Sequence, residues 1–338
     1  MQCGSALGFE TDMLETVALN VENNGLFSVK GKNSKNQYRY CNNHGYDVCN
    51  WLVPAADNTG FCKACALNRT IPDLGKPEFM QRWRTIENAK HRLIYQLLRM
   101  QLPLVNKQQA EETGLAFDFM ADETTDDSER VMTGHDNGVI TININEADDI
   151  EREMARKQMD EVYRTVLGHF RHEIGHYYWD RLIDHTTELD SFRNLFGDDQ
   201  LDYEAALSKH YKDGAPANWN ANYISAYATM HPWEDWAETW AHYLHIIDTL
   251  ETAYSFGLSV HPLVAQTKKL HAEIKKDPYA IEDFEAIMDL WLPLTFAMNS
   301  LNRSMGLRDI YPFIISMPVK EKMKFIHNVV VKAASKKQ

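Results

Sequence analysis

The segment HEIGH, residues 172–176, places two histidines four positions apart, with a glutamate directly after the first. On a helix, His172 and His176 lie one above the other on one face, so both imidazoles can bind a single Zn²⁺. Such an ion lowers the pKa of a bound water to about 7, and Glu173 can take the proton of that water as general base. The segment therefore predicts metal-assisted hydrolysis, with both histidines as metal ligands and Glu173 as the catalytic base.

The surroundings of this short pattern support a helical metal site. Apolar residues recur at helical spacing as a core stripe, and His169 falls on the other face together with the two ligand histidines. Gly175 costs about 1 kcal/mol inside a helix relative to alanine, which indicates that another group approaches the backbone there. His169 lies one turn too early to bind the same ion, so we interpret it as a packed or hydrogen-bonded residue.

A catalytic zinc needs a third protein ligand and an open position. The pattern HExxHxxGxxH is absent, because YYWDRLIDH follows His176. The segment HPWEDWAETWAHYLH, residues 231–245, offers another solution, since Pro232 fits the first turn of a helix and Glu234 and Glu238 share one of its faces. One glutamate can bind zinc while the other accepts a hydrogen bond from the far nitrogen of a zinc-binding histidine.

The same segment contains candidate donors for the oxyanion that forms during amide hydrolysis. His242 and Tyr243 are candidate catalytic residues of this kind, together with His231 at the start of the segment. Ordinary packing in an aromatic helix is the alternative interpretation for each of them.

Cysteines form a second metal-binding pattern nearer the N-terminus. Cys62 and Cys65 form a C-x2-C knuckle, and Cys41 and Cys49 form a wider C-x7-C pair. Two facing turns would hold four thiolates tetrahedrally around a structural Zn²⁺, whose binding would provide most of the folding free energy of this segment. His44 could replace either member of the first pair. Reduced core cysteines remain the alternative, because the C-x7-C spacing is unusual.

Longer stretches of the chain resemble one family. The segments YRYC, VCNWL, FCKACALNRTIPDL, VMTGHDNGVITININEAD and SAYATMHPWEDWAETWAHYLH are similar to those of bacterial zinc-binding metallopeptidases with an N-terminal zinc ribbon. The resemblance covers about residues 38–255. It falters at the N-terminus, where that family usually has paired cysteines before the position of Cys3.

The HEIGH segment, followed 234 − 176 = 58 residues later by EDWAE, also resembles the gluzincin metallopeptidases. The resemblance implies one catalytic and one structural Zn²⁺, with Glu234 as the third catalytic ligand and Glu238 as the outer partner of His172. Asp235 and Glu238 stand where those enzymes usually have Asn and Asp, and the longer side chain of Glu238 leaves the reverse assignment open.

The elements that position these residues predict an α+β protein. We expect a small zinc-ribbon-like N-terminal module over residues 1–70, followed by a mainly helical zincin-like metallopeptidase domain with a small β-sheet over residues 71–338. Strands and turns are expected over residues 1–37, 115–120 and 138–145. Helices are expected from about residue 76 to Pro103, from about 148 onward, and over 232–254, 263–275, 281–303 and 318–334. An aromatic loop region is expected over residues 185–224.

Composition restricts the partners. The chain has 35 Lys and Arg against 48 Asp and Glu, a formal charge of −13 that disfavours nucleic-acid binding. The sequence contains neither an apolar run of membrane-spanning length nor a signal-peptide pattern at its N-terminus, so we expect no membrane partner, a cytoplasmic location and reduced cysteines.

The function favoured by these observations is zinc-dependent hydrolysis of a peptide or protein substrate, with a zinc-activated water and Glu173 as general base. The run GVITININ is a candidate edge strand that could hold an extended substrate by strand addition. Two alternatives use the same residues differently: a zinc hydrolase of another amide, and a zinc-ribbon binding protein with a degenerate peptidase domain. The sequence indicates no particular oligomeric state.

Overall fold

The computed structural model describes residues 4–32, 36–122, 130–148, 165–263 and 267–335. The chain folds into two compact units. The first unit comprises Met1–Arg99, Leu104–Ala155 and Thr165–Phe170. The second comprises, of the described residues, Met100–Pro103 and those within Arg171–Gln338. Cys3 and residues 149–164, the first part of the helical stretch expected from about residue 148, lie outside the described residues.

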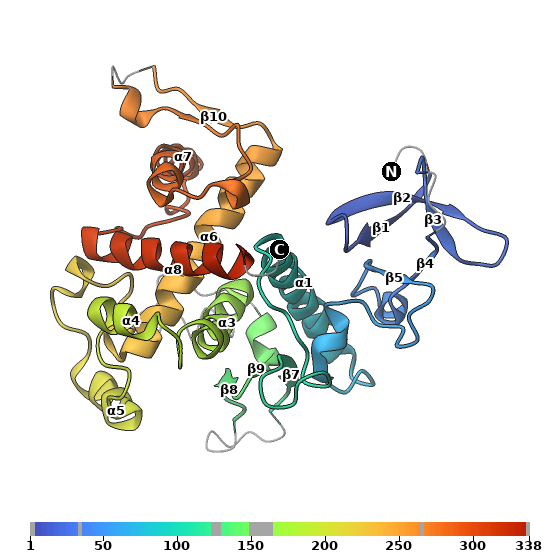
Figure 1. The fold of residues 1–338 in the computed structure, drawn as a ribbon, viewed down its shortest axis with the longest axis horizontal. Helices are drawn as coiled ribbons and strands as arrows, with labels where there is room; N and C mark the ends of the chain where they lie inside the picture. The colour runs from blue at the N-terminus through green and yellow to red at the C-terminus, as the bar shows by residue number, and fades with distance from the viewer. Residues whose placement is uncertain (1–3, 33–35, 123–129, 149–164, 264–266, 336–338) are drawn as a thin grey trace. The chain divides into compact units, whose positions relative to one another are not determined.

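A five-stranded antiparallel sheet begins the first unit within the described part of the chain (Figure 1). Its strands are β1 (Ala6–Glu10), β2 (Glu15–Val21), β3 (Phe27–Val29), β4 (Tyr38–Tyr40) and β5 (Leu52–Pro54), in that spatial order. The inward residues of these strands form a small apolar core, made of Val17, Leu19, Val29, Tyr38 and Leu52. The strand-and-turn pattern expected over residues 1–37 is confirmed in the described part of that range.

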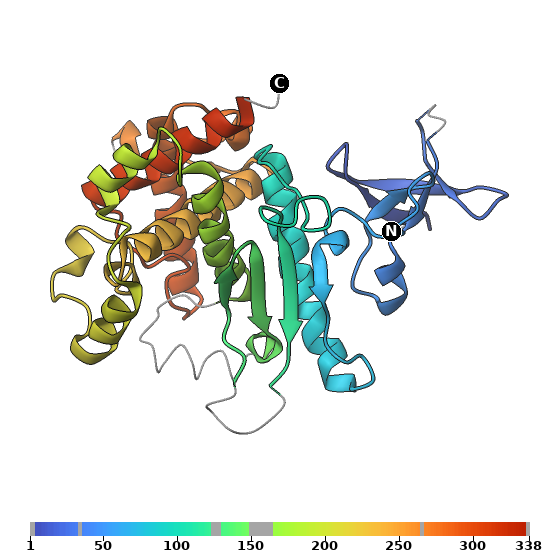
Figure 2. The same ribbon diagram turned by 60° about the horizontal axis from the view of Figure 1, so that its bottom comes forward.

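A second sheet of the first unit combines parallel and antiparallel pairing (Figure 2). Its order is β6 (Asn68–Thr70), β7 (Ala116–Met120), β9 (Val139–Asn143) and β8 (Gly134–Asp136). Strand β7 pairs in parallel with both of its neighbours, and β8 pairs antiparallel with β9.

The expectation that GVITININ forms an edge strand is wrong, because β8 covers the outer side of β9. Asp136 pairs with Val139, which leaves Asn137 and Gly138 as a two-residue loop with φ values of 47° and 79°. An Asn-Gly loop with both residues in the left-handed region is the turn that a tight hairpin prefers. The dipeptide therefore folds the preceding segment back onto β9 and places this strand inside the sheet.

Helix α1 (Pro77–Arg99) lies along this second sheet (Figure 2). The helix expected from about residue 76 is confirmed, and it carries a fully buried apolar stripe. The stripe consists of Trp83, Ile86, Leu93, Ile94 and Leu97. The helix ends before Gln101, whose φ of 55° interrupts helical geometry, and before Pro103.

The second unit is mainly helical within its described residues. Its helices are α3 (Val166–Leu182, whose first residues belong to the first unit), α4 (Leu189–Phe196), α5 (Tyr203–Asp213), α6 (Pro232–Ser255), α7 (Phe284–Ser304) and α8 (Met317–Ser335). Helix α6 is buried along most of its length, and α8 packs across it (Figure 1). The helices expected over residues 232–254, 281–303 and 318–334 are confirmed.

Two expectations for the second unit are wrong. Residues 185–224 contain α4 and α5 rather than only loops, because the turn-forming segments FGDD and KDGAP mark the ends of these helices. Asp202 caps the start of α5, and Gly197 and Gly214 end α4 and α5. The described part of residues 263–275 holds a single 3-10 turn (Lys268–Leu270) and β11 (Ala272–Glu273) rather than the expected helix. Strand β11 pairs antiparallel with β10 (Ser259–Val260).

A β-rich N-terminal region followed by a mostly helical region with small sheets confirms the expected α+β class. Across the described ranges, the helices are too short or too polar for any of them to span a bilayer.

Candidate metal centres

Two histidines of α3 converge on one point of the second unit. The Nε2 atoms of His172 and His176 are 3.2 Å apart, as expected for two imidazoles one helical turn apart that face a common centre. His176 is almost completely buried and His172 is partly buried. Glu173, between them in sequence, is also buried, at 8% exposure.

Gly175 is the point where α3 meets α6. A Cβ atom at this position would lie 3.1 Å from the Cα of Ala237 and 3.2 Å from Cδ1 of Trp240. The indole Nε1 of Trp236 donates a 2.9 Å hydrogen bond to the carbonyl oxygen of Gly175. The prediction that another group approaches this glycine is therefore confirmed, and that group is the backbone and aromatic side chains of α6.

Helix α6 presents its two glutamates to different sides of His172. Oε2 of Glu234 lies 2.9 Å from His172 Nε2, and Oε1 of Glu234 lies 3.5 Å from His176 Nε2. Oε1 of Glu238 lies 2.7 Å from His172 Nδ1, on the far side of the ring. One ligand atom each from His172, His176 and Glu234 thus falls within a group whose members are all within 4.8 Å of one another.

The electrostatics of this group suit a cation. Burial raises the pKa of Glu234, yet the two imidazoles hold it well below its ordinary value. Burial lowers the pKa of His172, but Glu234 and Glu238 raise it well above its ordinary value. Oε2 of Glu234 is buried, and its polar contact among the described residues is the 2.9 Å approach to Nε2 of His172. Two imidazole nitrogens and a carboxylate oxygen form the His₂Glu donor set of catalytic zinc, so these residues fit the ion.

Asp235, where gluzincins usually have Asn, belongs to a separate buried ion pair. Its Oδ2 accepts a 2.6 Å hydrogen bond from Nζ of Lys322 on α8. Burial raises the pKa of Asp235 to about 7, although Lys322 opposes this shift. Lys322 also donates to the carbonyl oxygen of Asn222 at 2.8 Å. The departure from the usual motif is therefore accommodated by a partner on the last helix.

Two tyrosines near the ligands were missed by the sequence analysis. The hydroxyl of Tyr203, the first residue of α5, donates a 2.9 Å hydrogen bond to Oε1 of Glu234. The ring of Tyr227 lies 6.1 Å from that of His172. Burial and the charge of Glu234 raise the pKa of both phenols, which keeps them protonated as donors. The capping residue Asp202, directly before Tyr203, was the available signal for an ordered helix here.

The predicted oxyanion donors make other contacts. Nδ1 of His242 lies 2.9 Å from the hydroxyl of Tyr311, and the hydroxyl of Tyr243 lies 2.9 Å from Nδ1 of His327. His231 caps α6, because its Nδ1 accepts the backbone N–H of Trp233 at 3.1 Å. In the first unit, Nδ1 of His169 pairs with Glu146, in keeping with the hydrogen-bonded role expected for it.

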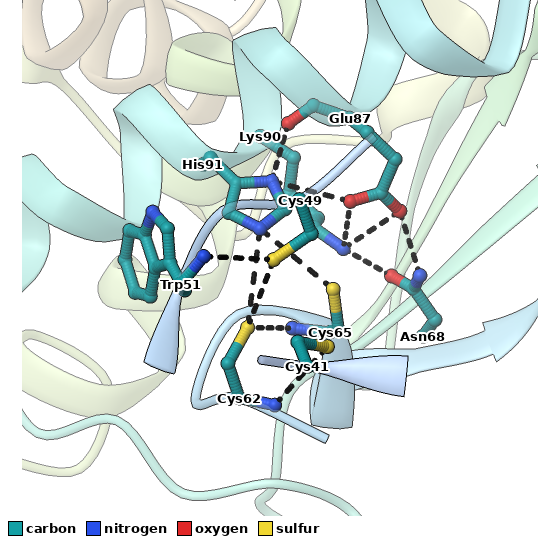
Figure 3. Close-up of polar contacts among 9 residues, drawn as sticks. All are labelled: Cys41, Cys49, Trp51, Cys62, Cys65, Asn68, Glu87, Lys90 and His91. Carbon is teal, nitrogen blue, oxygen red and sulfur yellow. Dashed lines mark hydrogen bonds and ion pairs between the residues drawn. The ribbon is translucent and has the colours of Figure 1, made fainter. Parts of the chain in front are cut away.

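The four cysteines of the first unit form a compact cluster (Figure 3). The sulfurs of Cys41, Cys49, Cys62 and Cys65 all lie within 4.8 Å of one another, and those of Cys49 and Cys62 are 3.7 Å apart. A zinc tetrahedron with Zn–S bonds of about 2.3 Å has edges of about 3.8 Å, so this spacing fits a metal and is far too long for a disulfide.

Backbone N–H groups and charge also fit a metal in the cysteine cluster. The N–H groups of Trp51, Cys62 and Cys65 point at sulfurs at 3.4–3.5 Å. Hydrogen bonds from the other thiols lower the pKa of Cys41, whereas the pKa values of Cys49 and Cys65 are raised. Four thiols this close therefore resist ionising together unless a cation is shared among them.

His44 lies beside the cysteine cluster and makes contacts of its own. Its Nδ1 is 2.8 Å from the carbonyl oxygen of Cys49, and its ring stacks on Tyr40 with centroids 3.9 Å apart. The four-membered sulfur group contains all four predicted cysteine ligands and does not include His44.

Comparisons with known proteins support zinc binding in general. A family described as "Putative zinc-binding metallo-peptidase" matches residues 79–329, and a zinc-ribbon domain family matches residues 1–76. Uncharacterized proteins of Mycobacterium bovis and Mycobacterium tuberculosis are 42% identical over 335 residues, which cover 99% of this chain and 91% of each relative. No solved structure matches. The chain therefore belongs to the zinc-binding metallopeptidase family, with a zinc-ribbon domain at its N-terminus.

Proposed function

We propose that this protein is a gluzincin-like zinc metallopeptidase that hydrolyses peptide bonds with a zinc-activated water. The observation that carries the proposal is the convergence of His172, His176 and Glu234 where α3 meets α6. Family membership supports metallopeptidase chemistry in general, and the geometry supports this particular ligand set.

The residues around the proposed catalytic centre have distinct proposed roles in metal binding and proton transfer. His172, His176 and Glu234 would hold the ion, and Glu238 would accept the Nδ1–H of His172, which leaves Nε2 free to bind it. Zinc, when bound, supplies a Lewis acid that acidifies the attacking water. Glu173 would take the proton from that water and pass it to the leaving amine.

The oxyanion formed from the scissile carbonyl needs a hydrogen-bond donor. Tyr203 is a better supported candidate than His242 or Tyr243, because its hydroxyl contacts the proposed ligand Glu234. Tyr227 is a second candidate, because its ring lies beside that of His172. Rotation of the Tyr203 hydroxyl away from Glu234 would make its proton available to substrate. His242 and Tyr243 stay predictions for this role.

The cysteine cluster is proposed as a structural zinc site with four thiolate ligands. We propose residues 1–70 as the zinc-ribbon module and residues 71–338 as the peptidase domain. A cytoplasmic location is part of the same proposal, because it would keep the four cysteines reduced for metal binding.

The test is Glu173→Gln, which keeps the size of the side chain but removes its basicity. We expect this variant to retain the catalytic zinc and to lose hydrolysis of a peptide library by a factor of about 10² or more. His176→Ala should lose both the zinc and the activity. Asp289→Asn, an exposed change on α7, serves as the control and should alter neither.

Each contrary result of this experiment has a definite meaning. Unchanged cleavage by Glu173→Gln of the substrates that the native protein cleaves would overturn the proposed mechanism. Cleavage of small amides with no cleavage of any library peptide would indicate the alternative hydrolase. If the native protein binds only one zinc ion per chain after reconstitution with zinc, the peptidase domain is degenerate.

A further inference from the structure

His91 of α1 lies against the sulfurs of the cysteine cluster (Figure 3). Its Nε2 is 3.7 Å from Sγ of Cys65 and 3.9 Å from Sγ of Cys62. The ring packs on Trp51 with centroids 5.1 Å apart and is almost completely buried. The contact therefore joins the ribbon to a helix that follows it in the sequence, within the first unit.

The other ring nitrogen fixes how His91 presents itself to the sulfurs. Nδ1 is 2.7 Å from the carbonyl oxygen of Glu87, one turn earlier on α1. A carbonyl oxygen can only accept, so Nδ1 must carry a proton. Four thiolates would complete a zinc tetrahedron and leave Nε2 outside it. For Nε2 to donate to these thiolates it must carry a proton as well, so the ring donates from both nitrogens as an imidazolium beside the Glu87 carboxylate.

A buried charged network holds His91 in this position. Glu87 and Lys90 have no exposed side-chain surface, and Nζ of Lys90 lies 3.0 Å from both carboxylate oxygens of Glu87. Oε2 of Glu87 is also 3.3 Å from Nδ1 of His91, and Asn68 donates to Oε1 at 2.7 Å. Burying a charge costs free energy unless the charge is paired, and in this network Glu87, Lys90 and His91 pair with one another.

We propose that His91 is the outer hydrogen-bond partner of the ribbon's metal centre. Its Nε2–H donates to the metal-bound thiolates of Cys65 and Cys62, and Glu87 holds the ring from behind. A Zn²⁺ with four thiolates carries a charge of −2, and a hydrogen bond donated from α1 to the thiolates stabilises that charge. The ribbon therefore retains its metal through α1 as well as through its own knuckles. This inference rests on the proposed ribbon zinc and is independent of the peptidase activity.

The test uses the full-length protein loaded with Co²⁺. Thiolate-to-cobalt charge-transfer absorption reports the ribbon alone, because the proposed catalytic ligands contain no sulfur. The measurement is the rate at which this absorption disappears in excess chelator. His91→Phe keeps the aromatic contact with Trp51 and removes both ring donors. His91→Gln returns an amide donor, and Ile86→Val is a mild core change on the same helix.

We expect His91→Phe to release the metal at least about tenfold faster than the native protein, the usual scale for loss of an outer partner. His91→Gln should recover part of this loss, and Ile86→Val should stay within about twofold of the native rate. The ligand-field spectrum should remain that of four sulfurs in every variant.

Four results would overturn the inference. His91→Phe could release cobalt no faster than Ile86→Val, or His91→Gln could be as fast as His91→Phe. If the native ligand-field spectrum is that of three sulfurs and one nitrogen, and this spectrum changes in His91→Phe, then His91 is a direct ligand. If the native protein shows no charge-transfer band, the ribbon zinc and this inference both fail, while the peptidase assays stand by themselves.

Discussion

His172 and Glu238 are joined by a 2.7 Å contact between Nδ1 and Oε1, on the opposite side of the imidazole from the nitrogen that faces Glu234. The two glutamates of α6 are four residues apart and lie on the same face, yet they meet different atoms of the same ring. This geometry supports the assignment of Glu234 to the metal and Glu238 to the orientation of His172.

The two glutamates should therefore differ in how strongly they affect metal binding. Glu234→Ala removes a proposed ligand and should abolish tight binding at the catalytic site. Glu238→Ala removes only the outer partner of His172 and should weaken zinc affinity about 10–100-fold. Chelator-competition titrations of both variants measure this difference. If Glu238→Ala is the variant that loses the metal entirely, the assignment must be reversed.

Gly175→Ala should destabilise the second unit even though alanine favours helices. The added Cβ would lie 3.1 Å from the Cα of Ala237, so α3 and α6 would have to separate. Overpacking costs about 1–3 kcal/mol, against a gain of about 1 kcal/mol in helix propensity. Urea denaturation should show a lower free energy of unfolding, together with weaker catalytic zinc binding.

Gly134→Ala provides the matched control, because a Cβ there meets no atom within 4 Å. The interpretation of Gly175 as a close-packing residue fails if both alanine variants leave the free energy of unfolding unchanged.

The native protein should contain two zinc ions per chain after reconstitution. The double variant Cys62→Ser/Cys65→Ser should contain one, because the proposed catalytic ligands are separate residues. Elemental analysis of desalted protein gives both numbers directly. One zinc in the native chain, or none in the double variant, would contradict two independent centres.

Acid should destabilise the second unit through His242. Burial lowers its pKa from 6.5 to about 4, so the unfolded chain binds a proton at this residue more readily than the folded chain. The free energy of unfolding should therefore fall as pH drops from about 6.5 to about 4, by up to roughly 3 kcal/mol, and this contribution should level off below that range.

Urea titrations of metal-free protein at several pH values test this expectation. His242→Gln has no ionisable ring and should show a shallower dependence over the same pH window. Equal slopes for the native protein and the variant would remove His242 as the cause.

Much of the metal chemistry could be predicted from the sequence because it depends on residue types at helical spacing. HEIGH brings His172 and His176 into register by periodicity alone, and the two acids of WEDWAE share a face for the same reason. The confirmed α1, α6, α7 and α8 follow from equally regular apolar patterns.

The missed features depend on tertiary contacts that have no local period. Tyr203 comes from the region 185–224, where loops were expected, and Tyr227 follows that region. Only folding brings them to Glu234 and His172. His91 follows Cys65 by 26 residues, on a helix whose pattern indicated packing alone. The position of β9 inside its sheet depended on one Asn-Gly turn.

The origin of the catalytic ligands on two helices has a consequence for biosynthesis. Glu234 is 58 residues beyond His176, so a ribosome that has just released α3 has not yet made the third ligand. A nascent or truncated chain that carries the whole HEIGH segment would hold only two of the three donors. The protein would thus remain inert toward its surroundings during translation and become a hydrolase only after α6 has docked at Gly175.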